Sequence, residues 1–432
     1  MKVVAFLPAK GTSQRIESKN MKLLNGKPLF LHTLEKLCDC DFIDEVYLDS
    51  ESNEVLYYAD YLDYIPLKRD PALATNKTDG HQMFYNEIKQ VDADIYIQIL
   101  GTSPFIKKET IKKGIDILLS DGPYDSVVLV KKDKQYLWNE GKPIYDKTHI
   151  PNSVDLPDTV IETMGMYIIK KEAAFKNKQR FGDNTYLLEA EPIEAVDINY
   201  QKDFELAEYI ARGQTYSEIA ELNVIKNHLT SAIISDILSE YNINNSITGM
   251  MSNFKDKKML GRANTVKIRF LEKGEDFNGI YKGLETYKSM RYGDIIVIEN
   301  EAKDYAYFGE LNANLAIRAG AVGTIIDGKT RDINEVTGLD YNVYSTGYCC
   351  SDVKYRATIE SHNKPITLQN VHIKPSDLIF ADVNGIVVIP RNLEKIVIKK
   401  AIETIKKENE VKLNLIKGLS EREILKRSDG GF

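Results

Sequence analysis

The first forty residues constrain the fold more than any other stretch of the chain. Residues 2–8 form a largely apolar run, which predicts a buried strand, and they lead directly into a loop rich in Gly, Ser and Thr. Apolar residues then recur at helical spacing over 27–37. A strand, a polar loop and a helix in this order predict an α/β layer with a ligand-binding loop at the end of the first strand.

The rest of the first half repeats this alternation of strands and helices. Short apolar runs, each followed by a helical segment, lie at residues 45–50, 94–100, 125–130 and 165–170. Such alternation is typical of a mainly parallel sheet that carries helices on both faces. We therefore expect an α/β sandwich.

The pattern changes around residues 211–217, where one helical segment is expected to stop at Gly213. The boundary predicts an N-terminal domain over 1–213 and a C-terminal domain over 216–432. In the second half we expect a helix up to about residue 241 and another helix near its end. Between them, strand-like runs lie at residues 264–270, 294–299, 322–326 and 385–389. This composition predicts a layered α/β domain of a different kind.

Composition narrows the class of protein further. The chain has 432 residues, a formal net charge of −7 and four cysteines. The acidic balance argues against nucleic acid or an anionic membrane as a partner and favours a small-molecule substrate. The cysteines match no common zinc-ligand spacing and are expected to be reduced. No signal peptide or bilayer-spanning run is recognisable, so the expected compartment is the cytoplasm.

The loop at residues 7–20, LPAKGTSQRIESKN, has the composition of a phosphate-binding loop. Backbone N–H groups around Gly11 and Ser13 can face a polyphosphate, and the side chains of Lys10, Arg15 and Lys19 can supply the positive charge. This combination favours nucleotidyl transfer, in which an acceptor oxygen attacks the α-phosphate and pyrophosphate leaves.

Five stretches in order resemble one family. The loop at 7–20 resembles the opening motif of the CMP-sugar-acid synthetases (acylneuraminate cytidylyltransferases). Further matching stretches are NMKLLNGKPL at 20–29, LKRDPALA at 67–74, GTSPF at 101–105 and VDINYQKDF at 196–204. The resemblance covers roughly residues 1–210 and implies a Rossmann-like nucleotidyltransferase sandwich that binds CTP.

The resemblance also assigns roles to single residues. It implies that Ser13 and Lys19 hold the triphosphate with Lys10 and Gly11, that Asn20 and Arg69 face the base, and that Asp197 binds Mg²⁺. Single residues also have a purely structural interpretation. Lys19 can be a solvated loop lysine, and Asp197 can cap the helix that follows it. The joint pattern favours the nucleotide site over these alternatives.

Several positions depart from the family pattern. Lys10 stands where an arginine is usual, which keeps the charge but loses the two-pronged guanidinium. Asn199 replaces a second metal-binding aspartate, so we expect either a single, weakly held Mg²⁺ or a shifted coordination. Residues 100–101 are Leu-Gly instead of the usual Gln-Pro, and residues 151–167 lack the Arg and Asn that the sialic-acid branch places there. The acceptor is therefore not expected to be sialic acid.

In the second half, polar side chains gather at residues 309–336. Glu310 begins a predicted helix, and Arg331, Asp332 and Glu335 follow a short predicted strand. An oxygen-rich group of this kind suits Mg²⁺ or Mn²⁺ better than zinc.

This half resembles the family of the RraA-like regulators and the class II pyruvate aldolases that act on 4-hydroxy-4-methyl-2-oxoglutarate. The matching stretches lie at residues 229–238, 261–266, 291–300, 309–336 and 374–390. The resemblance implies that Asp332 binds the metal, Glu335 holds metal-bound water, Arg331 clamps a 2-keto acid and Glu310 positions a water. It also implies a homo-oligomer, a trimer or hexamer, held by this domain.

The sequence thus predicts a CTP-dependent cytidylyltransferase for a small acidic acceptor, such as a keto-deoxy sugar acid, fused to a divalent-metal aldolase or decarboxylase. The main alternative is transfer to a phosphonate or phosphate monoester, with the C-terminal domain as a non-catalytic oligomerisation or regulatory module. A regulator of RNA degradation is the least favoured alternative, because the chain is acidic and carries a transferase domain.

Overall fold

The computed structural model describes residues 1–75, 77–420 and 423. The chain divides into two compact units, with the division between Ala211 and Arg212. This division lies inside one helix, α6 (Gln201–Lys226), which continues through Gly213 without the expected break. A Cβ at Gly213 would meet nothing within 4 Å, so the glycine lowers helix propensity but has no role as a stop.

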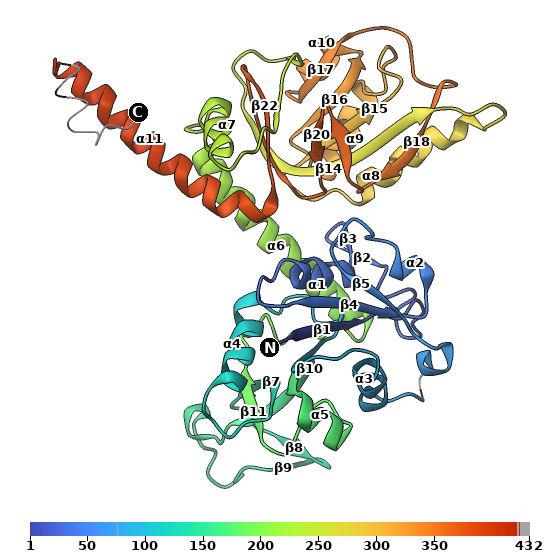
Figure 1. Cartoon of the computed structure of the whole chain (residues 1–432), viewed down its shortest axis with the longest axis vertical. Coiled ribbons are helices and arrows are strands. Elements are labelled where there is room, and N and C mark those ends of the chain that lie inside the picture. The colour runs from blue at the N-terminus through green and yellow to red at the C-terminus, as the bar shows by residue number, and fades with distance from the viewer. Residues whose placement is uncertain (76, 421–422, 424–432) are drawn as a thin grey trace. The chain divides into compact units, whose positions relative to one another are not determined.

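The N-terminal unit is built on a seven-stranded sheet in the order β11-β7-β10-β6-β1-β4-β5 (Figure 1). Its strands are β1 (Val3–Pro8), β4 (Glu45–Ser50), β5 (Ile65–Lys68), β6 (Ile95–Ile99), β7 (Ser126–Asp133), β10 (Thr159–Lys170) and β11 (Thr185–Glu189). Only β10 runs against its neighbours. The predicted mainly parallel α/β sandwich is confirmed.

Helices cover both faces of this sheet. The core on one face joins strand residues such as Leu7 and Ile97 to Leu34 and Ile115 of two helices. On the other face, Phe6 and Tyr96 pack against Phe84. The helices of this unit are α1 (Leu29–Cys38), α2 (Asn53–Leu56), α3 (Gly80–Ile88), α4 (Lys108–Leu119) and α5 (Lys171–Asn177), with short 3-10 turns at Pro71–Ala74 and Ser153–Asp155.

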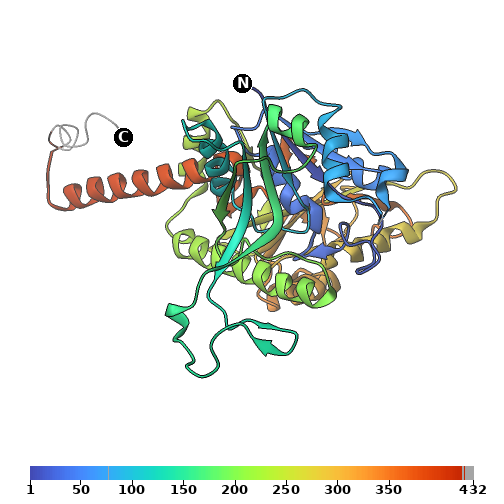
Figure 2. The same cartoon turned by 90° about the horizontal axis from the view of Figure 1, so that it is seen from below.

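Two small hairpins complete the unit. The hairpin of β2 (Leu23–Leu24) and β3 (Lys27–Pro28) follows the first loop. The second hairpin, β8 (Trp138–Asn139) and β9 (Lys142–Pro143), lies in a segment between β7 and β10 that extends away from the sheet (Figure 2). Trp138 on this segment is 62% exposed.

The C-terminal unit has a nine-stranded mixed sheet. The order is β12-β22-β21-β14-β15-β16-β17-β13, and β18 also pairs with β14. The four central strands β14 to β17 are parallel, and the outer pairings are antiparallel. The strands are β12 (Ser246–Ile247), β13 (Met251–Ser252), β14 (Met259–Phe270), β15 (Asp294–Asn300), β16 (Gly323–Thr330), β17 (Asn342–Tyr348), β18 (Ala357–His362), β21 (Leu378–Asp382) and β22 (Gly385–Ile389), with a separate hairpin of β19 (Ile366–Leu368) and β20 (Val371–Ile373).

Helices and the small hairpin enclose this second sheet. Ala313 and Ala316 of one helix pack on Ile298 and Ile326, while the β19–β20 hairpin covers the opposite face. The helices are α7 (Ser231–Glu240), α8 (Leu284–Lys288), α9 (Glu310–Ala319), α10 (Ile333–Gly338) and α11 (Glu394–Ile416), with 3-10 turns at Phe277–Gly283 and Arg391–Leu393. The central strands are rich in Ile and Val and almost wholly buried, as parallel strands covered on both faces require. The predicted layered α/β domain is confirmed.

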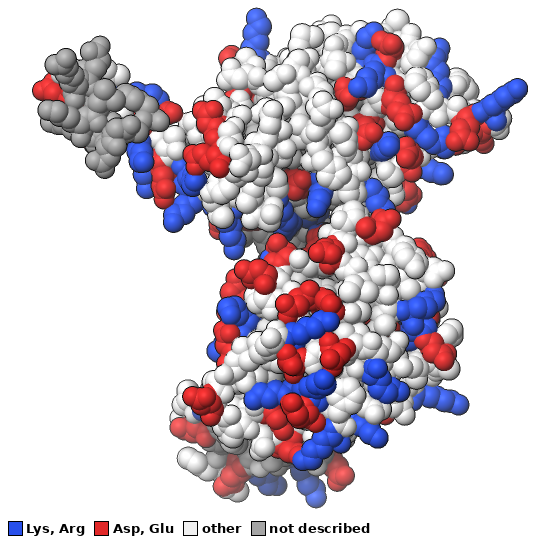
Figure 3. Space-filling view, viewed as in Figure 1, with Lys and Arg blue, Asp and Glu red and all other residues white. Residues whose placement is uncertain are grey.

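The surface carries charges of both signs. On the face drawn in Figure 3, Lys and Arg are interspersed with Asp and Glu over both units. Among the helices that the structure describes, none is long and apolar enough to cross a membrane.

Candidate functional site

The loop after β1 lies at the edge where parallel strands β1, β4 and β6 end. The N–H of Gly11 donates to Oε1 of Glu51, at the end of β4, over 2.9 Å. A Cβ at Gly11 would lie 2.5 Å from Cβ of Ser52, so only glycine allows this approach. Asn20 closes the loop, since its Nδ2 donates to the carbonyl oxygen of Lys10 over 2.8 Å. The strand–loop–helix opening therefore positions the loop as predicted.

Two lysines of this loop contact different segments of the chain. Lys10 Nζ donates to the carbonyl oxygen of Thr75 over 3.1 Å, and Lys19 Nζ donates to that of Ile198 over 2.8 Å. Burial lowers the pKa of both lysines; neighbouring Arg69 also lowers that of Lys10, and Asp197 partly opposes the effect at Lys19. Arg15 is exposed and lies 5.4 Å from the ring centroid of Tyr200. Ser13 lies half-buried in the same loop.

Asp197 faces this loop from the segment before α6. Its Oδ1 is buried without a hydrogen-bond partner, while its Oδ2 accepts from Nδ2 of Asn199. The N–H groups of Asn199 and Tyr200 donate to Asp203, over 3.0 and 2.8 Å, so Asp203 rather than Asp197 caps the helix. An orphaned carboxylate oxygen beside a lysine fits a site that holds Mg²⁺ together with substrate phosphates.

A buried ion pair lies next to the loop, beneath α3. Arg69 Nε donates to both carboxylate oxygens of Asp49 at 3.0 Å, and Nη2 donates to Oδ2 at 2.6 Å. The two side chains are 0% and 1% exposed. The Nη1 atom of Arg69 has no partner. Arg69, expected to face the base, thus has one free guanidinium nitrogen and is otherwise fixed by Asp49.

Glu87 of α3 joins this pair from the helix side. It is fully buried, and burial together with the neighbouring Asp49 raises its pKa well above the ordinary value. Nε2 of Gln98 on β6 donates to Oε2 of Glu87 over 2.5 Å. A protonated Glu87 can in turn donate to Asp49, so the ion pair is held by a neutral carboxyl group rather than repelled by a second anion.

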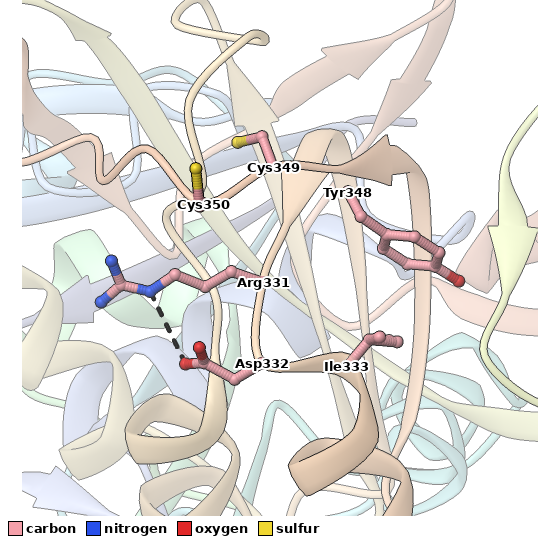
Figure 4. A pocket seen from close by; sticks show the side chains of 6 residues that line it. All are labelled: Arg331, Asp332, Ile333, Tyr348, Cys349 and Cys350. Carbon is pink, nitrogen blue, oxygen red and sulfur yellow. Dashed lines mark ion pairs between the residues drawn. The ribbon is translucent and has the colours of Figure 1, made fainter.

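In the C-terminal unit, a pocket of about 480 Å³ opens at the ends of β16 and β17 (Figure 4). Its lining residues are Arg331, Asp332, Ile333, Tyr348, Cys349 and Cys350. Two of the four predicted residues, Arg331 and Asp332, therefore lie in one pocket. All four cysteines of the chain are free thiols, and two of them border this pocket.

The acidic residues of this site lie at the starts of helices α9 and α10. The N–H of Glu310, at the start of α9, donates to Oδ2 of Asp332 over 3.2 Å. Asp332 has a left-handed backbone (φ 54°), and a Cβ at Gly309 would lie 2.5 Å from its Oδ2. Glu335 lies exposed in the first turn of α10.

Arg331 has a second anionic neighbour. Its Nη1 lies 2.7 Å from Oδ2 of Asp352, and its Nε lies 3.6 Å from Oδ2 of Asp332. Both Arg331 and Asp352 are more than a third exposed. Asp352 was not predicted, because twenty residues and a strand separate it from Arg331 in the sequence.

The carboxylates at this pocket fit Mg²⁺ better than a metal that needs three or more protein ligands. Within the described part of the chain, no three His, Cys, Asp or Glu side chains are arranged to hold a metal ion. Mg²⁺ commonly keeps several waters and needs only one or two carboxylates, so Asp332 alone can serve as a direct ligand.

Comparison with known proteins assigns both units. A family model for cytidylyltransferases matches residues 4–226, more than half of the 432 residues. The chain belongs to the cytidylyltransferase family. Residues 231–388 match a second family model, RraA-like, described as Aldolase/RraA. The two resemblances found in the sequence are confirmed, and the cytidylyltransferase match includes the loop and Asp197.

Curated relatives of this cytidylyltransferase family member match parts of the chain. Protein DlpA of Legionella pneumophila is 31% identical over 44% of this chain and 30% of its own length. The CMP-N,N'-diacetyllegionaminic acid synthase of the same species is 31% identical over 27% and 53%. N-acylneuraminate cytidylyltransferase A of Danio rerio is 25% identical over 80% and 86%. The chain thus spans about a third and about half of the first two relatives.

Proposed function

We propose that the N-terminal unit transfers CMP from CTP to a small sugar acid and releases pyrophosphate. The observation that carries this proposal is the meeting of Lys10, Lys19, the free Nη1 of Arg69 and the orphaned Oδ1 of Asp197 around one loop at the strand ends. Membership of the cytidylyltransferase family supports the reaction class, and the legionaminic acid relative supports a sugar acid as acceptor.

The chemistry follows from where the charges lie. An acceptor hydroxyl oxygen bonds to the α-phosphorus of CTP, the bond from that phosphorus to the β-phosphate bridge oxygen breaks, and the hydroxyl proton goes to solvent. Lys19 and Lys10 offset negative charge on the triphosphate, and the N–H groups of the loop orient it. Mg²⁺, held by Asp197, would neutralise the phosphate charge further.

For the C-terminal unit we propose a divalent-metal lyase that acts on a 2-keto acid. Arg331 supports this role, because its exposed guanidinium can exchange Asp352 for the oxygens of a substrate. Asp332 would hold the metal, whose positive charge would offset negative charge that develops on the substrate. Glu310 and Glu335 would position water for proton transfer. A homo-oligomer is part of this proposal; it is supported by exposed apolar side chains on α9 and α11, Leu311, Leu413 and Ile416.

The deciding experiment measures pyrophosphate release with each NTP and Mg²⁺ against keto-deoxy sugar acids, phosphonates and phosphate monoesters. We expect CTP-specific release with a sugar acid and a loss of about 100-fold or more in Lys19→Ala. Release only with a phosphonate or phosphate monoester would replace the acceptor class. Neither release nor CTP binding would remove the transferase proposal.

The second unit is tested separately with oxaloacetate and Mg²⁺ or Mn²⁺. A metal-dependent loss of oxaloacetate that vanishes in Asp332→Ala supports the lyase. An inert domain that still holds the oligomer together in size-exclusion chromatography with light scattering supports an assembly module instead.

A further inference from the structure

One buried cation in the N-terminal unit lacks a counter-ion. Arg180, between α5 and β11, is 4% exposed, and its Nε is buried without a hydrogen-bond partner. Across residues 1–75, 77–420 and 423, no carboxylate forms an ion pair with it. The other two deeply buried arginines are paired, Arg69 with Asp49 and Arg262 with Glu218 and Glu394. Because an unpaired buried charge is costly, Arg180 calls for an anion from outside the chain.

The guanidinium of Arg180 is fixed on two sides. It lies 4.9 Å from the ring centroid of Tyr167 on β10. It also lies against Gly80, where a Cβ would come within 2.3–2.6 Å of its Cζ, Nη1 and Nη2. The N–H of Arg180 donates to Nδ1 of His81 over 3.2 Å. These contacts hold the cation beside the N-terminus of α3, which the carboxylate of Asp79 caps by accepting from the N–H of Gln82 over 2.9 Å.

This position lies on the same face of the sheet as the buried Arg69–Asp49 pair. Tyr167 is the register partner of Gln98, which bonds to Glu87 beside the Arg69–Asp49 pair. The pairing of β10 with β7 is irregular between Glu162 and Tyr167. In this stretch the carbonyl oxygen of Gly165 accepts from the N–H of Leu100, in the loop after β6, over 3.0 Å. Bulged strands often reposition side chains beside active sites. Arg180 thus lies on the sheet face that carries the Arg69–Asp49 pair and is separate from the lysines of the phosphate loop.

We propose that Arg180 binds the carboxylate of the acceptor sugar acid and so selects acceptors by charge. This inference rests on the proposed transferase function. A guanidinium offers two parallel N–H donors that match the two oxygens of a carboxylate. In a 2-keto sugar acid the carboxylate is attached to the carbon that bears the attacking hydroxyl. Fixing the carboxylate therefore also orients the nucleophile toward the α-phosphorus.

The test compares an acid with its neutral analogue. 3-Deoxy-D-manno-octulosonate and N,N'-diacetyllegionaminate are supplied with CTP, each as the free acid and as the primary amide, and glycerol 3-phosphate serves as the phosphate probe. Wild-type protein should prefer the acid over the amide by about 10- to 100-fold in kcat/KM. In Arg180→Met this preference should fall to a few-fold at most, with acceptor KM raised about 10- to 100-fold and CTP KM unchanged.

Two further variants separate binding from structure. Lys178→Met removes an exposed positive charge two residues away and should keep the wild-type preference. Gly80→Ala leaves every charge in place and introduces the better helix former, yet it should raise acceptor KM because its Cβ displaces the guanidinium. A thermal shift with CTP equal to that of wild type shows that each variant has folded.

The outcomes are distinct. An Arg180→Met protein that turns over sugar acids with the wild-type preference for acid over amide overturns the inference while the transferase function stands. A preference for glycerol 3-phosphate that Arg180→Met abolishes overturns the assignment to a carboxylate. Failure of the unmodified protein to release pyrophosphate with any acceptor would contradict the transferase function itself.

Discussion

In the N-terminal unit the guanidinium of Arg69 is sealed beneath α3 against Asp49, whereas in the C-terminal unit Arg331 is about a third exposed and reaches Asp352 beside an open pocket. A buried ion pair offsets its desolvation only through close hydrogen bonds, and those between Arg69 and Asp49 fix its geometry when the protein folds, although Nη1 of Arg69 is left without a partner. An exposed pair is worth little and can exchange partners. The first site is therefore preorganised for one charge distribution, and the second can rearrange around its substrate.

The largest difference is expected when the same substitution is made in both units. Arg69→Leu leaves Asp49 buried without its cation and beside Glu87, and should cost about 3–5 kcal/mol in the free energy of unfolding. Arg331→Leu removes an exposed arginine and should cost far less stability while it impairs turnover of a 2-keto acid. Chemical denaturation of both variants measures the difference, and equal costs would contradict the contrast between the sites.

The second-largest effect is expected at Gly309, which lies against Asp332 and Arg331 in the C-terminal unit. Gly309→Ala places a Cβ 2.5 Å from Oδ2 of Asp332 and 3.1 Å from Cγ of Arg331, so one of these side chains must move. A displacement near 1 Å can cost about 100-fold in rate, and we expect a loss of that size in metal-dependent decay of oxaloacetate. Gly338→Ala is the matched control, because a Cβ there meets nothing within 4 Å. Similar losses in both variants would indicate general destabilisation instead.

The sequence predicted much of the fold because the signals were local. The alternation of apolar runs and helical segments was enough for the parallel sheet, and the loop after β1 lies where it was expected. The break at Gly213 was wrong, because an exposed glycine only lowers helix propensity and the residues on either side favour the helix.

In the first site, Arg69 and Asp197 lie far from the loop in sequence and were predicted only through the family resemblance; in the second site, the residues whose proximity the structure shows as predicted are adjacent in sequence. Arg331 and Asp332 adjoin each other and share a pocket, but Asp352 joins them only through the fold. Glu87 and Arg180 were missed for the same reason. A glutamate on an amphipathic helix and an arginine in a connecting segment are usually exposed, and only tertiary packing shows that these two are buried.

A smaller effect is expected in the pH dependence of stability, to which Glu87 beside the buried Arg69–Asp49 pair contributes. The pKa of Glu87 is raised above its unfolded value, so the folded state retains a proton that the unfolded state loses. Stability contributed by this group is present below the unfolded pKa near 4.5 and falls as pH rises, by up to about 1.4 kcal/mol per pH unit. Glu87→Gln keeps an amide donor toward Asp49 but cannot ionise, so this slope should disappear.

The measurement is the free energy of unfolding at pH 5.5, 6.5 and 7.5, taken from the transition that CTP shifts. Asp332→Asn is the comparison in the other unit, because that carboxylate is exposed. An unchanged slope in Glu87→Gln would mean that Glu87 is ionised in the folded protein.

The smallest effect is expected at Asp197, the proposed Mg²⁺ ligand of the first site, where Asn199 stands in place of a second aspartate. The Nδ2 of Asn199 donates to Oδ2 of Asp197, so the amide takes the place of a second carboxylate and leaves one oxygen, Oδ1, unpartnered. Asn199→Asp exchanges this donor for a negative charge beside Asp197. Without metal the two carboxylates repel each other, and with Mg²⁺ they share its charge.

We therefore expect a slightly lower melting temperature without metal and a Mg²⁺ requirement about ten-fold lower in pyrophosphate release, equivalent to about 1.4 kcal/mol. Gln201→Glu adds a negative charge at the exposed start of α6, where its side chain contacts Lys22 and Glu205, and controls for electrostatics at a distance. If Asn199→Asp leaves the Mg²⁺ requirement unchanged, Asp197 is not where the metal binds.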